Sequence, residues 1–399
     1  MKIAFIVGEF STLSEDFILN QITGLLEMGH EVTVICESKP KDIEVYQDSR
    51  IHYLGFSEGW IMRAVKGFPL FFRNLLRSPF HTISSLNFLE YGWHALSLRL
   101  LYYSTPFIGD KFDIVHCHFR KNCLTGSLLK EIGFFRCSLV ASLYDNNVSA
   151  NARRAGGGLY MPLFRKADLI ITVSEHMREE LIRLGCGKDK IMVNHISVDR
   201  KKFPYKVREM RGSGTTRVTT IASLVEESGV EYGIRAFAKV LDEHGDMEYT
   251  IIGDGPLRKH LQEVIAELDV NDTVNLIGGE KKGEITKTLY DSDVLIAPNL
   301  ISEDEGEIPT ILLEAQASGL PAISTRRNGI DEVIVDGGTG FLVKEKNVEE
   351  LANKLSLLVK NPYVRLDMGE ACRQHVEKEY KTETINKQLE DAYQRLVQK

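Results

Sequence analysis

Short runs of apolar and β-branched residues alternate along the chain with longer segments of helical pattern. In the first half these runs occupy residues 3–7, 31–36, 113–116, 139–143, 169–173 and 191–194. The runs are apolar at consecutive positions, which is typical of strands in a parallel sheet that helices cover on both faces. Between them lie helical segments such as 15–27, for which we predict Ser14 as the N-cap and Gly29 as the stop.

A second series of runs follows a break in this pattern. Residues 201–216 are polar and basic and contain Arg211-Gly212-Ser213-Gly214, which is typical of a linker. Beyond it the alternation restarts, with predicted strands at residues 218–222, 249–252, 274–277, 294–297 and 321–324. We therefore predict an α/β protein with two doubly wound, Rossmann-like domains, over residues 1–205 and 206–380. Because such sheets bind ligands at the carboxyl ends of their strands, we expect the site in a cleft between the two sheets.

Composition narrows the class of protein. The 399 residues are 43% hydrophobic and 26% charged, which is typical of a globular protein long enough for two domains. A net charge of −7 argues against overall attraction to nucleic acid, and no nucleic-acid-binding motif is present. The six cysteines form no C-x-x-C pair, which indicates reduced thiols and a cytoplasmic setting. The apolar run at the N-terminus is too short for a signal peptide, and we find no run of 18 uncharged apolar residues that could span a membrane.

Residues 60–108 differ from the rest of the first domain. They hold eleven of the 34 aromatic residues, both tryptophans and five Lys or Arg, but only one acid, Glu90. A basic, aromatic and amphipathic stretch can lie in a membrane interface or receive a lipid-linked substrate. It can equally be a helical insertion that packs its aromatic side chains on the first domain. Both interpretations stay open, and the first would make the protein peripheral at the inner membrane face.

The densest group of chemically useful residues lies in the segment 303–321. It begins Glu303-Asp304-Glu305-Gly306-Glu307 and is followed by a predicted helix from Pro309 to Gly319. Proline suits the first turn of a helix and glycine suits its end. The free N–H groups at the helix start form an anion site suited to a diphosphate. Glu314, on the same helix, is placed to accept hydrogen bonds from vicinal hydroxyls, although an exposed helix glutamate without a ligand would give the same pattern.

With this segment in place, the sequence resembles the family 4 glycosyltransferases, retaining enzymes of the GT-B fold. Their hallmark is Glu-x7-Glu with an E-G-x-P start and an E-A ending. Further matches cover nearly the whole chain and lie at residues 14–21, 113–119, 167–174, 252–256, 291–294 and 324–332. Within the family, the sequence is most similar to the bacterial exopolysaccharide and colanic-acid type.

The resemblance implies a fold and an activity. The fold is GT-B, in which two Rossmann-like domains face each other across a cleft and a last helix, here 381–399, returns to the first domain. The activity is transfer of a sugar from a nucleotide diphosphate sugar to a glycan or lipid-linked acceptor. The leaving phosphate itself takes the acceptor's proton, and the resemblance implies no metal and no cofactor besides the donor.

The resemblance also implies roles for individual residues. Glu314 would bind the ribose hydroxyls, and the first glutamate of the motif would hold the donor sugar. Because Gly306 stands eight residues before Glu314, an inserted residue leaves Glu305 or Glu307 for that contact. The expected nucleotide contacts are Glu314, Gly253, Gly255, Gly278, Ile308, Pro309, Ser223 and Ser228. The expected contacts of the sugars are Glu305, Glu307, Tyr144 and His118.

One departure from the family pattern concerns the donor diphosphate. The family usually places Arg and Lys there, in a pattern like R-L-x-x-x-K-G, whereas this chain has Ser223 and Ser228 at those positions. Loss of such donors would cost about 2.7–4 kcal/mol each in the transition state. The candidate substitutes are Lys281, Lys282, Arg326 and Arg327.

A second departure lies in the first domain. In place of the family's H-G-x-D, the chain reads Tyr144-Asp145-Asn146-Asn147, so that the expected aspartate is Asn147. Tyr144 keeps the position of the histidine and can still bind a sugar hydroxyl. The pair His116 and His118 has no further ligand at metal-binding spacing, so we interpret it as lining the cleft, with His118 on the acceptor side.

Other function classes remain to be weighed against a transferase. A dehydrogenase is excluded because Val7-Gly8-Glu9-Phe10-Ser11 lacks the G-x-G-x-x-G pattern after the first strand. A catalytically silent family member that binds a nucleotide sugar, a glycan or a true transferase is the main alternative, because both diphosphate cations are lost. A GT-B epimerase, with the same donor site and no acceptor, is a third.

Overall fold

The chain divides into two units in the computed structural model. It describes residues 1–8, 16–37, 50–56, 59–144, 148, 152, 158–205, 214–279, 282–300, 310–327 and 329–398. The N-terminal unit consists of Met1–His195 and Ile385–Lys399, and the C-terminal unit is Ile196–Thr384. The chain therefore passes between the units after His195 and after Thr384, whereas the sequence places these boundaries after residues 205 and 380.

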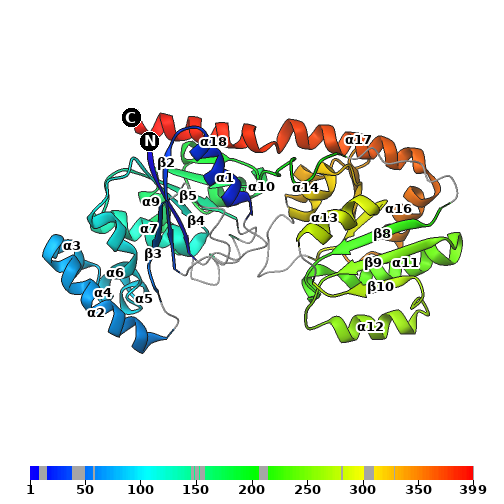
Figure 1. Ribbon diagram of the computed structural model, residues 1–399, viewed down its shortest axis with the longest axis horizontal. Helices are drawn as coiled ribbons and strands as arrows, with labels where there is room; N and C mark the ends of the chain where they lie inside the picture. Colours follow the sequence, from blue (N-terminus) through cyan, green and yellow to red (C-terminus); the bar gives the residue numbers. More distant parts are fainter. Residues whose placement is uncertain are drawn as a thin grey trace. The chain divides into compact units, whose positions relative to one another are not determined.

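The N-terminal unit is built on a seven-stranded sheet among the described residues, in the order β3-β2-β1-β4-β5-β6-β7 (Figure 1). Its strands are β1 (Lys2–Gly8), β2 (Glu31–Cys36), β3 (Arg50–Tyr53), β4 (Ile114–His118), β5 (Ser138–Leu143), β6 (Leu169–Thr172) and β7 (Ile191–Val193). Every neighbouring pair is parallel, so the carboxyl ends of all these strands share one edge. The strand order reverses between β1 and β4, and such switch points are where ligands bind in open parallel sheets.

Helices cover this sheet and include the last helix of the chain. They are α1 (Asp16–Glu27), α7 (Arg120–Ile132), α9 (Met161–Lys166), α10 (Glu175–Arg183) and α18 (Thr382–Val397). From Ile385 onward α18 belongs to the N-terminal unit. Its Asn386 side chain donates a hydrogen bond to the Asn20 carbonyl at 2.9 Å, and a Cβ on Gly24 would lie 1.9 Å from the same side chain. Helices α1 and α18 thus meet at a glycine.

The C-terminal unit has a six-stranded parallel sheet among the described residues, in the order β10-β9-β8-β11-β12-β13. Its strands are β8 (Thr216–Ile221), β9 (Met247–Ile252), β10 (Val274–Ile277), β11 (Val294–Ala297), β12 (Ala322–Thr325) and β13 (Gly340–Val343). Its helices are α11 (Val230–His244), α12 (Arg258–Glu267), α13 (Lys282–Asp291), α14 (Thr310–Ala317), α15 (Ile330–Val333), α16 (Val348–Lys360) and α17 (Pro362–Glu379). The strand order reverses between β8 and β11, as in the first unit.

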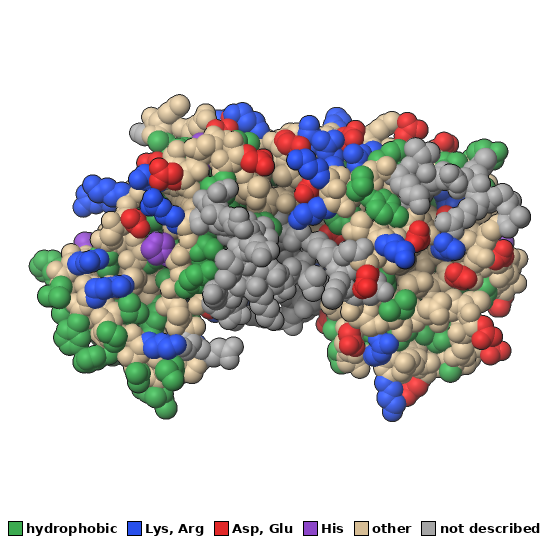
Figure 2. All heavy atoms as spheres, in the orientation of Figure 1, with side chains coloured by type: hydrophobic (Ala, Val, Ile, Leu, Met, Phe, Trp, Pro, Cys, Tyr) green, Lys and Arg blue, Asp and Glu red, His purple; other side chains and the backbone are tan. Residues whose placement is uncertain are grey.

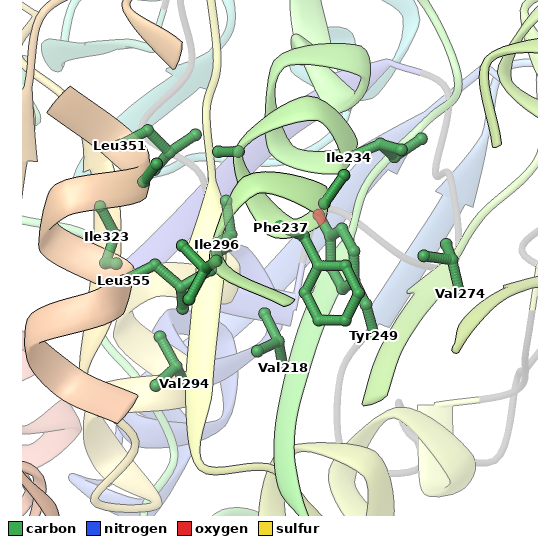
Figure 3. Close-up of a cluster of buried hydrophobic side chains, with 14 of the residues drawn as sticks. Val218, Ile234, Phe237, Tyr249, Val274, Val294, Ile296, Ile323, Leu351 and Leu355 are labelled. Atoms are coloured by element: carbon green, nitrogen blue, oxygen red, sulfur yellow. The ribbon is translucent and has the colours of Figure 1, made fainter. Parts of the chain in front are cut away.

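An apolar core joins this sheet to the helices α11 and α16 (Figure 3). Phe237 of α11 is fully buried, and its ring lies 5.2 Å from that of Tyr249 on β9. Leu351 and Leu355 of α16 approach the same sheet over Ile323. Strands that are apolar on both faces are required here because helices cover both.

The eleven strand segments predicted from the sequence are confirmed, with ends that differ by a few residues. Two strands, β3 and β13, were not predicted from the sequence. β3 is an edge strand whose four residues, Arg50 to Tyr53, are half-buried or exposed, so it lacks the apolar run that marks the others. β13, Gly340 to Val343, is a buried and mostly apolar run at the other edge of its sheet, which the sequence analysis did not single out.

The segment 60–108 forms a helical insertion between β3 and β4. Its elements are α2 (Trp60–Arg77), α3 (Pro79–Ser84), α4 (Phe88–Tyr91), α5 (Trp93–Leu96), α6 (Arg99–Ser104) and a 3-10 turn, Thr105–Ile108. The interpretation as a helical insertion that packs on the first domain holds for part of it, and the membrane interpretation stays a prediction. Tyr102 and Tyr103 are buried against the unit, whereas Trp60 and Phe80 are largely exposed. In the described part of the chain, we find no helix with the length and apolar character needed to cross a bilayer.

The core of the C-terminal unit gives a direct test of this packing. We expect Phe237→Ala to lower the free energy of unfolding of this unit by about 3–5 kcal/mol, because it leaves a cavity between α11 and the sheet. Phe80→Ala is the matched control, since Phe80 is 85% exposed and its loss should change stability by no more than about 0.5 kcal/mol. Urea unfolding followed by circular dichroism measures both, and equal midpoints for the two variants would contradict the assignment.

Candidate functional site

The site in the C-terminal unit lies at the carboxyl edge of its sheet, next to the switch point between β8 and β11. Segments that the sequence singles out follow three of the strands at this edge: Ser223 to Gly229 after β8, Gly253 to Pro256 after β9, and Gly278 after β10. Helix α14, which carries Glu314, follows β11. The parallel order therefore gathers most of the predicted nucleotide contacts on one edge of one sheet.

Gly253 and Gly255 lie where the backbone of the loop after β9 contacts the backbone of the loop after β8. A Cβ on Gly253 would lie 1.8 Å from the Ala222 carbonyl oxygen, and one on Gly255 would lie 2.5 Å from that of Leu224. The Leu224 N–H donates to the Asp254 carbonyl at 2.9 Å, which ties the two loops together. Only glycine fits at these two positions, because a side chain would collide with the backbone of the loop after β8.

A second close approach spans the switch point itself. Gly229 has φ +62°, and a Cβ there would lie 2.1 Å from the Pro298 carbonyl oxygen. The Leu300 N–H donates to the Glu227 carbonyl at 2.7 Å. The loop after β8 is therefore joined to the loop after β11, and α11 begins at Val230, directly after Gly229, with no side-chain cap.

The serines that replace the family's cations lie in this loop. Ser223 is exposed and Ser228 is half-buried at the end of a short 3-10 turn, Glu226–Ser228. A serine hydroxyl can donate a hydrogen bond but brings no charge. Any positive charge for a diphosphate has to come from another segment of the edge.

Arg326 and Arg327 follow β12 and differ in their surroundings. Arg326 forms an exposed ion pair with Asp336, with its Nη2 2.5 Å from the carboxylate. Arg327 is partly buried, and its Nη1 donates to the Leu300 carbonyl at 3.1 Å. Burial lowers the pKa of Arg327 from its ordinary value, yet a guanidinium stays charged at neutral pH. Leu300 links Arg327 to the loop after β8, because its carbonyl accepts from Arg327 and its N–H donates to the Glu227 carbonyl, one residue before Ser228.

Glu314 sits near the middle of α14 and is half-buried between Leu313 and Ala315, which are buried. Gly319, after the helix, has φ +78°, as expected for a helix stop. The other acidic and helix-start residues of the motif lie outside the described residues: Glu303, Asp304, Glu305, Glu307, Ile308 and Pro309. The same holds for Lys281 and for Asp145 to Asn147.

One residue of this edge was missed by the sequence analysis. Arg258, at the start of α12, donates to the Gly253 carbonyl at 3.3 Å and to the Leu276 carbonyl at 3.0 Å. It fastens the glycine turn to β10. No local pattern marks this role, because both acceptors are backbone atoms supplied by other segments.

The histidine pair of the N-terminal unit does not line an open surface. His116 and His118, on β4, are both 0% exposed, which corrects the expectation that they line a cleft. His116 Nε2 lies 2.7 Å from Ser142 Oγ and its Nδ1 lies 2.5 Å from the Tyr393 hydroxyl. His118 Nδ1 lies 2.7 Å from the hydroxyl of Tyr144, which is also buried. The Nε2 of His118 is buried without a hydrogen-bond partner among the described residues.

Burial sets the charge of this pair. It lowers the pKa of His116 to about 3, and burial together with the neighbouring His116 lowers the pKa of His118 well below its usual range. Both rings are therefore neutral at pH 7. Within the described part of the chain, no three His, Cys, Asp or Glu side chains are grouped so that they could hold a metal ion.

Comparison with known proteins identifies relatives over the full length. Residues 14–202 match the family described as Glycosyltransferase Family 4, and residues 206–375 match Glycosyl transferases group 1. The sequence is 28% identical to the putative colanic acid biosynthesis glycosyltransferase WcaL of Salmonella typhimurium, over 98% of each chain. It is also 28% identical to the amylovoran biosynthesis glycosyltransferase AmsK of Erwinia amylovora, over 100% of each chain.

Solved structures with low sequence identity share the fold. The structure of Anabaena Alr3699/HepE in complex with UDP and glucose has a TM-score of 0.73 at 17% identity, and the match covers 99% of this chain and 100% of that one. Sucrose-phosphate synthase of Thermosynechococcus elongatus has a TM-score of 0.76 at 17% identity, with 99% of each chain covered. The predicted α/β fold with two Rossmann-like units, of the GT-B type, is confirmed.

The buried histidines predict how stability depends on pH. The unfolded chain protonates His116 below about pH 6.5, whereas the folded chain does so only near pH 3, so stability is full above pH 6.5 and falls as the pH drops below it. At pH 5 this one group costs about 2 kcal/mol. We expect His116→Asn to be less stable at pH 7 but to lose about 2 kcal/mol less than the native protein between pH 7 and pH 5. Urea unfolding at both pH values measures this, and an identical loss in the two proteins would show that folding leaves the pKa of His116 unshifted.

Proposed function

We propose that this chain, which belongs to the family 4 glycosyltransferases, moves a sugar from a nucleotide diphosphate sugar to a glycan or lipid-linked acceptor with retention of configuration. The observation that carries the proposal is the carboxyl edge of the C-terminal sheet. There Gly229, Gly253 and Gly255 let the loops after β8, β9 and β11 pack backbone against backbone at a switch point, on the unit that also carries Glu314. Open parallel sheets bind nucleotides at such a point.

The relatives support the class of product and of donor. Two of them are named for the biosynthesis of colanic acid and amylovoran, and a solved neighbour contains UDP and glucose. We infer a role in making a surface polysaccharide or exopolysaccharide, with a nucleoside diphosphate sugar as donor. We place the reaction in the cytoplasm because all six cysteines are free thiols, as expected in a reducing compartment.

In the proposed donor site, each segment meets one part of the nucleotide. Glu314 accepts hydrogen bonds from the ribose hydroxyls, and the backbone near Gly278 contacts the base. Gly253 and Gly255 have no side chain, so the backbone of their turn can approach the nucleotide closely. Ile308 and Pro309, which precede α14 in the sequence, and the start of α14 at Thr310 meet the diphosphate, because free N–H groups at a helix start stabilise anions. Glu305 or Glu307 holds the sugar.

The diphosphate needs positive charge, and Arg327 is the cation that we assign to it. Its guanidinium is held against the Leu300 carbonyl, one residue from the segment 301–309 and next to the loop that carries Ser228. Arg326 is less suitable because it is exposed and pairs with Asp336 at the surface, whereas Arg327 is partly buried at the sheet edge, where the charge of Glu345 also acts on it. Arg327 would thus supply, from the loop after β12, the charge that relatives supply from the loop after β8.

In the proposed reaction, the bond between the sugar C1 and the diphosphate oxygen breaks while the acceptor oxygen bonds to C1 on the same face. The acceptor's proton passes to the leaving phosphate, so the protein needs no general base of its own. Its contribution is to position the two substrates and to stabilise the charge that develops on the diphosphate. This scheme uses no metal or further cofactor, and activity should therefore survive a chelator.

Ser223 and Ser228 favour one other function, a silent member of the family that binds a nucleotide sugar, a glycan or a transferase without turnover. Without positive charge at those positions, the negative charge that develops on the diphosphate is less stabilised, so the diphosphate is a poorer leaving group. The two functions differ in the step after donor binding. An enzyme releases nucleoside diphosphate when an acceptor is added, whereas a silent binder does not.

Donor binding is tested by a thermal-shift titration with UDP, GDP, ADP and their common sugar conjugates. We expect one nucleotide to stabilise the protein, by about 2.7 kcal/mol at a hundred times its dissociation constant. A shift followed by acceptor-dependent release of that nucleoside diphosphate supports the enzyme. A shift without release supports the silent binder, and no shift with any nucleotide would contradict a donor site.

The role of Arg327 is tested with the nucleotide that the titration identifies. We expect Arg327→Gln to weaken binding of the nucleoside diphosphate tenfold or more, since a hydrogen bond to a charged group contributes about 1.5–3 kcal/mol, and to leave the monophosphate unaffected. Arg326→Gln is the matched control and should change neither affinity by more than a few fold, because its ion pair is exposed. Isothermal titration measures all four affinities. Equal losses for both nucleotides, or for both variants, would remove Arg327 from the diphosphate site.

A further inference from the structure

Helix α2 presents its apolar side to solvent. Ile61, Val65, Phe68, Phe72 and Leu76 follow one another at helical spacing, which puts them on one side of the helix, and each is between 48% and 87% exposed. We call these five residues the apolar face. An amphipathic helix of a globular unit normally buries such a stripe. The apolar face of α2 therefore lacks a cover from the described part of its own chain.

The inner side of α2 is held by small and polar residues instead. Its buried residues are Gly67 and Asn74. The Asn74 side chain donates to Thr105 Oγ1 at 3.2 Å, and the Tyr102 hydroxyl donates to the Arg63 carbonyl at 2.8 Å. These contacts fix the rotation of the helix about its axis, so the exposure of the apolar face is built into the packing.

Neighbouring helices extend the apolar surface. Large apolar side chains of α3, α4 and α5 are more than half exposed: Phe80, Ile83, Phe88, Leu89, Trp93 and Leu96. Figure 2 shows hydrophobic side chains gathered over these helices, with Lys and Arg side chains beside them. The basic residues Lys66, Arg73 and Arg77 also lie on α2, which carries no acidic residue. An apolar surface edged with cations, with Glu90 of α4 as the one acid in the sequence 60–108, fits the interface of an anionic bilayer.

A basic pocket of about 450 Å³ opens next to this surface. Arg63, Arg99, Arg120 and Lys121 line it together with the aromatic rings of Phe56 and Trp93, and no Asp or Glu is among its lining residues. Trp93 is 74% exposed and also belongs to the apolar surface, so the pocket and the surface are continuous. The volume lies in the range of small-molecule sites, about 300–1,000 Å³.

One of these cations is structural. Arg99 is 3% exposed, forms an ion pair with Glu37 and donates to the Tyr103 hydroxyl at 2.8 Å and to Asn122 Oδ1 at 2.7 Å. Burial raises the pKa of Glu37, but the charge of Arg99 and the other contacts outweigh it and hold the pKa below its usual value. Glu37 thus balances Arg99.

The remaining cations come from two different elements. Arg63 projects from α2, where its guanidinium lies 4.1 Å from the centre of the Phe56 ring. Arg120 and Lys121 are the first residues of α7, whose N-terminus has no side-chain cap. The partial positive charge of that helix end adds to theirs. The pocket therefore concentrates positive charge at the carboxyl edge of the N-terminal sheet, beside an apolar surface.

We propose that the basic pocket binds the diphosphate headgroup of a lipid in the bilayer, and that the apolar face of α2 docks on that bilayer. The proposal rests on the proposed function, for which it names the acceptor as a glycan carried on a lipid diphosphate. A bilayer is favoured over a second copy of the chain because two such surfaces would oppose Lys66, Arg73 and Arg77 to the same cations. An anionic lipid surface instead attracts each cation.

Vesicle flotation tests the docking surface. Three compositions are compared: phosphatidylcholine alone, phosphatidylcholine with phosphatidylglycerol, and phosphatidylcholine with a long-chain polyprenyl diphosphate at the same total charge. We expect the native protein to bind the polyprenyl diphosphate vesicles most tightly. The variant Phe68→Ser with Phe72→Ser should bind every composition at least roughly tenfold more weakly, because two apolar side chains no longer insert. Tyr363→Ser with Val335→Ser, exposed apolar residues of the C-terminal unit, is the matched control and should bind as the native protein does.

A second variant tests the pocket. Arg120→Gln with Lys121→Gln should lose the preference for polyprenyl diphosphate over phosphatidylglycerol, roughly fivefold for each cation, while it keeps binding to phosphatidylcholine. Lys259→Gln with Lys354→Gln provides the control for loss of charge alone. Circular dichroism melting checks that each variant is folded. Competition by soluble inorganic diphosphate that abolishes the preference without releasing the protein from the vesicles would further support a headgroup site.

Several outcomes would overturn the proposal. Absence of vesicle binding removes the docking surface, and equal binding to both anionic compositions removes the headgroup site. A dimer that Phe68→Ser with Phe72→Ser dissociates, seen by sedimentation in the absence of vesicles, would assign the apolar face to a second copy of the chain. None of these experiments uses a nucleotide, so their failure is distinguishable from failure of the donor site.

Discussion

The carboxyl edge of the C-terminal sheet, where we propose that the donor binds, depends on close contacts between backbone atoms of neighbouring loops that leave no room for a side chain. At Gly253, Gly255 and Gly229 a Cβ would lie 1.8, 2.5 and 2.1 Å from the carbonyl oxygens of neighbouring loops. These loops follow β8, β9 and β11, and their contacts join the segments on the two sides of the switch point between β8 and β11. Hydrogen bonds between backbone groups, rather than bulky side chains, hold these loops together next to the start of α11, whose N-terminus has no side-chain cap. That arrangement suits an anionic and polar ligand.

Each unit holds basic side chains at the carboxyl edge of its sheet. In the C-terminal unit Arg327, rather than a residue after β8, stands against the Leu300 carbonyl. In the N-terminal unit the interior histidines are neutral, and positive charge gathers instead in the basic pocket. Under the two proposals, each unit offers one place for a phosphate group. A transferase that joins a nucleoside diphosphate sugar to a lipid-linked glycan needs two such places.

The fold was largely predictable because apolar runs of consecutive residues mark the central strands of parallel sheets. β3 lies at a sheet edge and is half-buried or exposed, so it left no apolar run, whereas the buried apolar run of β13 was overlooked. The glycines at the carboxyl edge of the C-terminal sheet were identified through the resemblance to the family. Arg258 did not, because its partners are carbonyl groups distant in sequence. The burial of His116 beneath Tyr393, which is 277 residues away, likewise depends on a tertiary contact that no local pattern contains. The apolar periodicity of α2 was visible, but only packing reveals that its apolar side faces outward.

Hydrogen exchange measured on the native protein tests the central claim, which assigns the two substrates to different units. The account predicts that the nucleoside diphosphate sugar slows exchange in the loops 223–229 and 253–257, in α14 and around 326–330. Vesicles that carry the polyprenyl diphosphate should instead slow exchange in 60–99 and 120–124. Protection of the same segments by both ligands, or nucleotide protection confined to the N-terminal unit, would contradict the account.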